Sequence, residues 1–132
     1  MHRLLLAFAA LLLLAAPAAA QREPEWRIAV EVDILLHPFR YEPREIRLAA
    51  GVPVRLHFVN NGRANLSFSA PDFFAAARVR RRDTRWLRGG GFRLAPGERR
   101  TIALVPAPGR YRARSTYLLH RLRGMSAQII VE

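Results

Sequence analysis

The C-terminal stretch at 106–132, PAPGRYRARSTYLLHRLRGMSAQIIVE, holds two short strand patterns separated by a loop. The prolines and the glycine of 106–109 predict a turn, because these residues end regular structure. Strands are predicted at 111–115 and, as the last element, at 128–132. His120 and Met125 fall in the connection between these two strands.

Upstream of this stretch, the same alternation of short apolar strands and turns continues. In 52–59, the apolar residues Val54, Leu56 and Phe58 alternate with more polar positions, which predicts a strand with one buried face. Further strands are predicted at 26–36, 45–49, 66–69, 92–94 and 101–105, and a helical turn at 72–77 with Asp72 as its N-cap.

Seven or eight short strands with proline and glycine turns and almost no helix indicate an all-β fold, an antiparallel Greek-key β-sandwich or barrel. In 26–36 we expect Ile28, Val30, Val32 and Ile34 to face the core.

The first twenty residues have the pattern of a secretory signal peptide. His2 and Arg3 precede an apolar run at 4–14, and alanines at 18–20 provide the small residues of a cleavage site. The run is short for a membrane-spanning anchor, and no cysteine is present for a lipid anchor. We therefore expect cleavage after Ala20, a mature chain of 21–132 that forms one domain without a transmembrane segment, and a periplasmic or secreted location.

The chain is strongly basic. All 22 of its Lys and Arg residues are arginine, and against 10 acidic residues they give a formal net charge of +12. Such a charge favours acidic proteins or anionic membrane surfaces as partners, whereas nucleic acid is not expected for an exported protein. Six arginines cluster near Trp86, and they form either a docking patch for such a partner or a solvated loop: Arg78, Arg80, Arg81, Arg82, Arg85 and Arg88.

The C-terminal pattern resembles the end of the cupredoxins, the small blue-copper proteins. The resemblance lies in Pro108-Gly109-Arg110-Tyr111, in Ser115, His120 and Gly124-Met125 at family spacing, and in the final apolar strand. It continues upstream through Phe39 and Pro43, 50–51, 54–60, 70–74 and 94–98, and so covers nearly all of 26–132. The resemblance implies the cupredoxin fold.

The resemblance also implies which residues stand at the copper-ligand positions. A type 1 copper site needs two imidazoles, a cysteine thiolate and a weak methionine ligand. His120 and Met125 match two of these ligands, but Leu66 stands at the position of the first histidine and Ser115 at that of the cysteine. We therefore predict a degenerate site that binds no copper as a blue centre, in a binding or structural module with no cofactor.

Two alternatives remain from the sequence. The first is a copper-handling protein that holds copper through His120 and Met125, which otherwise are fold positions, with Met125 over the barrel end and His120 at the exposed rim. The second, an electron-transfer cupredoxin, conflicts with the absence of cysteine. His37 and His57 are expected to be surface histidines, and because no catalytic constellation is recognisable, an enzyme is not predicted.

Overall fold

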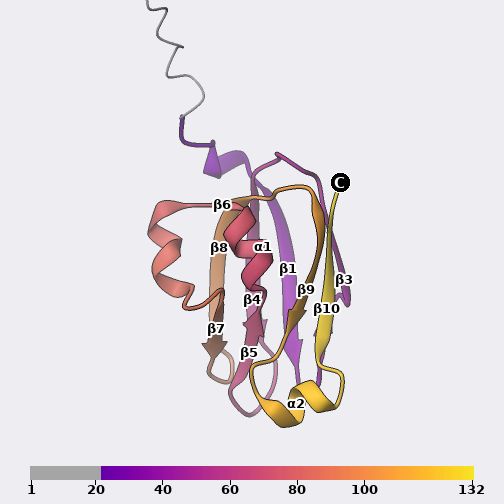
Figure 1. Ribbon diagram of the computed structural model, residues 1–132. Helices are drawn as coiled ribbons and strands as arrows, with labels where there is room; N and C mark the ends of the chain where they lie inside the picture. The colour runs from indigo at the N-terminus through magenta and orange to yellow at the C-terminus, as the bar shows by residue number, and fades with distance from the viewer. Residues whose placement is uncertain (1–21) are drawn as a thin grey trace, which may run out of the picture.

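The computed structural model describes residues 22–132, which form two five-stranded β-sheets packed face to face (Figure 1). The predicted signal peptide at 1–20 lies outside the described residues. The strand order is β2-β1-β4-β8-β6 in the first sheet and β3-β10-β9-β5-β7 in the second. The β-sandwich prediction is thus confirmed. The strands are β1 (Val30–His37), β2 (Arg40–Glu42), β3 (Glu45–Leu48), β4 (Val54–Asn60), β5 (Leu66–Ser69), β6 (Arg78–Val79), β7 (Gly91–Leu94), β8 (Arg99–Val105), β9 (Gly109–Arg114) and β10 (Ser126–Val131).

Two strand pairs are parallel, which differs from the antiparallel arrangement that the sequence pattern predicted. β1 pairs with β4 in parallel, and β10 pairs with β3 in the same way, while the other pairs are antiparallel. The chain leaves β1, passes through β3 in the second sheet and then returns to β4. Because β1 and β4 are joined by this crossover and not by a hairpin, they can run in the same direction.

The core lies between the sheets, and β4 shows how the sequence builds it. Val54, Leu56 and Phe58 are buried on one face of β4, as their alternation predicted. The Phe58 ring centroid lies 4.8 Å from that of Phe68 in β5 and 4.8 Å from that of Phe92 in β7. This aromatic cluster joins the two sheets, and each such pair adds about 0.5–1.5 kcal/mol beyond its buried area.

The first predicted strand begins later than expected. A 3-10 helix occupies Trp26–Ile28, and β1 starts only at Val30. The side chains of Ile28 and Val30 are 81% and 55% exposed, so the prediction that they face the core is wrong, whereas Ile34 is fully buried. Alternation along a single strand cannot show how far the opposite sheet extends over it, and here only the C-terminal half of β1 is covered.

Two short α-helices flank the sheets. α1 (Pro71–Ala76) confirms the helical turn, but Asp72 is not its N-cap, since the cap position is Ala70 and Pro71 begins the helix. α2 (Leu118–Leu122) lies in the β9–β10 connection and a second 3-10 helix covers Arg81–Trp86, neither of which the sequence pattern predicted. No helix within 22–132 is long and apolar enough to span a membrane.

Candidate functional site

Three of the four positions that the family resemblance assigned to copper ligands lie in the β9–β10 connection. Ser115 directly follows β9, His120 lies within α2, and Met125 precedes β10. The Ser115 N–H donates a hydrogen bond to the Met125 carbonyl oxygen at 3.2 Å, and the Met125 N–H donates one to the His120 carbonyl oxygen at 3.0 Å. Leu66 begins β5, which neighbours β9 in the second sheet, so the fold brings the four positions to one end of the sandwich (Figure 1).

A buried hydroxyl network surrounds Ser115, the position that the family resemblance assigned to the copper thiolate. The Ser115 side chain is fully buried, its Oγ lies 3.1 Å from the Ser67 Oγ, and the Tyr117 N–H donates to it at 3.1 Å. The Ser67 Oγ accepts a further hydrogen bond from the Thr116 N–H at 2.8 Å. These bonds tie the β9–β10 connection to β5. The Ser115 oxygen is therefore engaged in the protein's own hydrogen bonds.

The position of the first histidine is filled by a core leucine. Leu66 is 2% exposed and stands opposite Leu94 of β7 in the sheet register. Its Cδ1 lies so close to Gly62 that a β-carbon there would approach it to 3.2 Å. Leu66 thus packs as part of the hydrophobic core, where it offers no donor atom to a metal.

The two ligand types that remain differ in burial. Met125 is completely buried and belongs to the core cluster. His120 is half-buried, and its ring makes edge contacts with Phe39 and Tyr117 at centroid distances of 5.1 and 5.5 Å. The His120 Nδ1 atom is buried without a hydrogen-bond partner among the described residues. The imidazole of His120 therefore has a nitrogen that no described residue binds.

This donor set does not fit a type 1 copper centre. Such a centre needs a thiolate in its trigonal plane, and the chain contains no cysteine. Serine keeps its proton near neutral pH and is a hard ligand, poorly suited to copper. Within 22–132, no group of three or more His, Cys, Asp or Glu side chains is arranged to hold a metal ion.

The two histidines of the first sheet make side-chain contacts of their own. His37 Nε2 lies 2.8 Å from a carboxylate oxygen of Glu42, and His57 Nδ1 lies 2.8 Å from the Thr101 hydroxyl. Their side chains are 17% and 29% exposed, so both are more buried than the solvated surface histidines that the sequence suggested.

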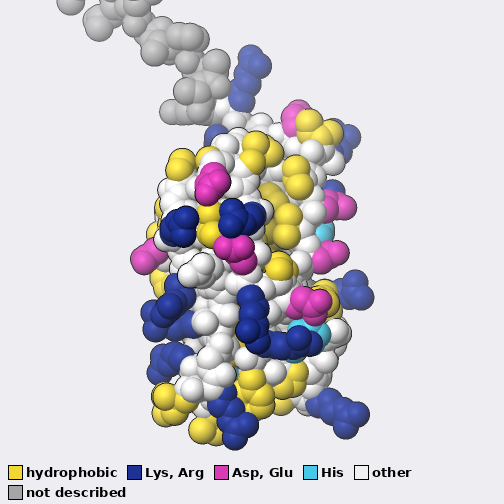
Figure 2. All heavy atoms as spheres, turned by 90° about the vertical axis from the view of Figure 1, so that its right-hand side faces the viewer, with side chains coloured by type: hydrophobic (Ala, Val, Ile, Leu, Met, Phe, Trp, Pro, Cys, Tyr) yellow, Lys and Arg dark blue, Asp and Glu magenta, His cyan; other side chains and the backbone are white. Residues whose placement is uncertain are grey.

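Apolar side chains are exposed around His120. Leu118, Leu119 and Leu122 of α2 are 58%, 72% and 72% exposed. The guanidinium of Arg123 lies 4.9 Å from the ring centroid of Phe39. Figure 2 shows apolar side chains and basic side chains together at the lower end of the molecule, where Figure 1 places α2.

The arginine cluster predicted from the sequence is divided in the structure. The Arg80 Nε donates to the buried Asp83 carboxylate at 2.7 Å, and the same carboxylate oxygen accepts a hydrogen bond from the Ala103 N–H. Arg80 therefore stabilises the contact between the 3-10 helix and β8. Arg78 lies 3.8 Å from Glu23. Arg81 and Arg82 are exposed on the 3-10 helix. Arg80 and Arg82 line a surface hollow beside Trp26, and Arg85 and Arg88 line a separate cleft.

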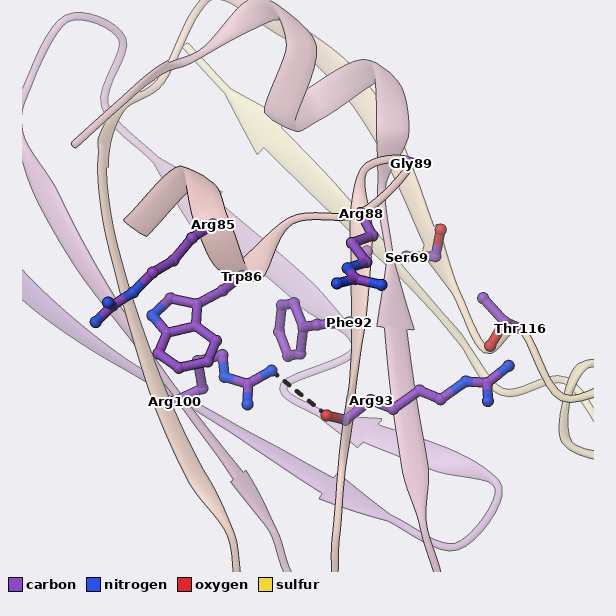
Figure 3. Close-up of a pocket in the computed structure, with 10 residues that line it drawn as sticks. Ser69, Arg85, Trp86, Arg88, Gly89, Phe92, Arg93, Arg100 and Thr116 are labelled. Atoms are coloured by element: carbon purple, nitrogen blue, oxygen red, sulfur yellow. Dashed lines mark hydrogen bonds between the residues drawn. The ribbon is translucent and has the colours of Figure 1, made fainter. Parts of the chain in front are cut away.

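That cleft has a volume of about 620 Å³ and lies between the 3-10 helix, β7 and β8 (Figure 3). Arg93 of β7 and Arg100 of β8 line it together with Arg85 and Arg88. The guanidiniums of Arg85 and Arg100 lie 4.7 and 4.5 Å from the ring centroid of Trp86. No sequence pattern indicated that Arg93 and Arg100 belong to this group, because they lie on different strands that only the folded sandwich brings together.

Comparisons with known proteins agree with this architecture. The family model described as "Cupredoxin-like domain" matches residues 4–131. The structure of sodium-dithionite-reduced auracyanin from the photosynthetic bacterium Roseiflexus castenholzii is similar with a TM-score of 0.58 and 21% identity, over 79% of this chain and 98% of that one. Auracyanin B is similar with a TM-score of 0.57 and 22% identity, over 79% and 89%. At these identities the structural likeness shows the fold alone.

The comparison with curated protein sequences finds no match. The family model, however, covers almost the whole chain, and the two-sheet fold is consistent with it. The chain therefore belongs to the cupredoxin-like domain family.

Proposed function

We propose that this domain is an exported, non-catalytic binding or structural module on the cupredoxin fold, and that it does not form a blue-copper centre. The observation that carries the proposal is the buried Ser115 hydroxyl, which hydrogen-bonds to Ser67 and to the Tyr117 N–H where a copper thiolate would be needed. The core leucine at position 66 supports it, because the trigonal plane then lacks two of its three strong ligands.

Titration of the purified protein with Cu(II) tests this proposal. We expect no intense visible absorption band, because that band depends on a copper–thiolate bond. A blue or green protein with stoichiometric copper would contradict the proposal.

A weak Cu(I) site is the second candidate function, and the unpartnered, buried Nδ1 of His120 favours it. Cu(I) accepts imidazole and thioether ligands, and Met125 lies in the same loop. Anaerobic Cu(I) competition with a chromophoric chelator should then show weaker binding in both His120→Ala and Met125→Ala. Affinity that neither substitution changes would exclude this candidate.

Export to the periplasm or the medium is part of the proposal and is supported by the signal-peptide pattern of 1–20. Mass spectrometry of the protein recovered outside the cytoplasm should give the mass of a chain beginning at Gln21. A chain that stays in the cytoplasm and retains 1–20 would contradict this part.

A further inference from the structure

We propose that the cleft lined by Arg85, Arg88, Arg93 and Arg100 binds an extended acidic segment of a partner protein. The inference rests on the proposed role as a binding module and names the site and the chemistry of its partner. It does not depend on whether His120 and Met125 bind copper, since those residues do not line the cleft.

The cleft concentrates positive charge that the described part of the chain does not neutralise. Arg100 has a carboxylate partner, Glu98, at 2.8 Å. For Arg85, Arg88 and Arg93, no carboxylate within 22–132 lies within ion-pair distance. Guanidinium groups bind carboxylates through two parallel hydrogen bonds, so these three side chains are suited to acidic partner residues.

The arrangement of these charges favours several separate carboxylates over one compact anion. In Figure 3, Arg85 lies beside Trp86, Arg88 lies above Phe92, and the Arg93 side chain extends towards Thr116 on the other side of the cleft. The guanidiniums are therefore spread along the cleft and do not converge on one point. An extended peptide with acidic residues at intervals matches this spread.

The position of the cleft in the fold also favours a polypeptide. β7 is the last strand of the second sheet, and its outer side carries no further strand among the described residues. Part of this edge is already bonded, because Gly91 forms a bridge with Arg88 and the Arg93 carbonyl oxygen accepts from Arg100. Extended peptides commonly dock beside the last strand of a sheet, and here such a peptide would bind chiefly through its side chains. The partner segment would lie in the cleft beside β7, with its carboxylates directed towards the arginines.

The walls of the cleft are held in place before any partner binds. Gly90 has a φ of +80°, and a β-carbon there would lie 2.3 Å from the Pro71 Cα, so the loop before β7 packs directly against the start of α1. The Arg100 Nη1 donates to the Arg93 carbonyl oxygen at 3.4 Å, which links β8 to β7 (Figure 3). The Trp86 side chain, flanked by two guanidiniums and 38% exposed, offers an aromatic surface of the kind enriched at binding hot spots.

A peptide titration tests the proposal. The probe is an acetylated peptide of alternating glutamate and glycine, and its glutamine–glycine counterpart serves as the neutral control. Binding is followed by Trp86 fluorescence in a Trp26→Phe background, because Trp26 is the only other tryptophan. We expect saturable binding of the acidic peptide that weakens with salt, and none of the neutral peptide.

Two variants with equal loss of charge separate the cleft from the general basicity of the protein. The cleft variant carries Arg85→Gln, Arg88→Gln and Arg93→Gln. The control variant carries Arg44→Gln, Arg112→Gln and Arg123→Gln, which line a different surface hollow beside β3 and β10. The cleft variant should bind the acidic peptide about tenfold more weakly or worse, and the control variant should stay within about threefold of the parent.

Several results would overturn the proposal. They are equal weakening in both variants, absence of peptide binding in the parent, and a preference of the cleft for inorganic phosphate or phosphatidylglycerol vesicles over the acidic peptide. Because all six arginines are exposed, both variants should keep the parent's thermal midpoint within a few degrees. Copper titration of the same samples is a separate readout, so failure of the cleft proposal is distinguishable from failure of the copper conclusion.

Discussion

Ser115, at the position that the family resemblance assigned to a copper thiolate, forms a buried hydroxyl pair with Ser67. Their hydroxyl oxygens lie 3.1 Å apart in a fully buried site, and they accept backbone hydrogen bonds from Thr116 and Tyr117. Buried hydroxyls are stable only when hydrogen-bonded, so serine at this position stabilises the β9–β10 connection. The shape of the β9–β10 connection is therefore held by hydrogen bonds within the connection and to β5.

Restoring the two missing ligands should restore a copper centre. The double variant Leu66→His, Ser115→Cys would present two imidazoles, a thiolate and the Met125 thioether, and on Cu(II) addition it should develop an intense visible band that neither single variant shows. Circular dichroism must first confirm folding, because Leu66 is a core residue. A folded double variant without the band would mean that Leu66 and Ser115 are not the ligand positions.

Tyr41 predicts a pH dependence of stability. Its hydroxyl is buried and donates to the Ser67 carbonyl oxygen at 2.5 Å, and burial raises the pKa of Tyr41 above its ordinary value of 10.0. The folded protein thus holds this proton more tightly than the unfolded chain, and the free energy of unfolding should fall as pH rises beyond about 10. At neutral pH, Tyr41→Phe should cost about 1 kcal/mol, because the Ser67 carbonyl loses its donor.

Urea unfolding measured from neutral to alkaline pH checks both effects. The alkaline decline should be smaller in Tyr41→Phe, which lacks the titrating group, and unchanged in the control Tyr117→Phe. An equal decline in Tyr41→Phe and the parent would assign the pH dependence to another group.

At the level of elements, local sequence patterns predicted which face of a strand is buried. They did not predict which strands pair, because pairing depends on residues far apart in the chain. The alternation of β4 predicted its buried face correctly, because each residue's side is set by its neighbours. The parallel pairing of β1 with β4 depends on a crossover through the other sheet, which no local pattern encodes. Family spacing could assign Leu66 and Ser115 to ligand positions as a prediction, whereas it could not indicate that Arg93 and Arg100 line one cleft.

The leucines of β5 and α2 should contribute very differently to stability. Leu66→Ala removes a buried side chain and should lower the free energy of unfolding by about 2–5 kcal/mol. Leu119→Ala alters a side chain that is 72% exposed, so it should change the free energy of unfolding by no more than about 0.5 kcal/mol. Urea unfolding of both variants gives the comparison. A large loss in Leu119→Ala would mean that α2 is covered in solution, for example by a second copy of the chain.

At the level of the whole molecule, the cleft combines segments that are separate in sequence and in sheet. The 3-10 helix brings Arg85, the second sheet brings Arg93, and the first sheet brings Arg100. Side chains of like charge are thereby held close together in a protein whose formal net charge is already +12. Like charges gathered in this way oppose folding, unless salt or a bound anionic partner screens them.

This repulsion should be visible in the salt dependence of stability. The thermal midpoint of the parent should rise when NaCl is added from low ionic strength to about 0.1 M, where the screening length falls to about 10 Å. The cleft variant with glutamine at 85, 88 and 93 should start from a higher midpoint at low salt and gain less from NaCl, since part of the repulsion is already removed. Ion pairs such as Arg55–Glu31 act in the opposite direction, because salt weakens them. A midpoint that falls with salt in the parent would therefore show that these pairs outweigh the repulsion, and a cleft variant whose midpoint at low salt equals that of the parent would show that the cleft arginines do not destabilise the fold.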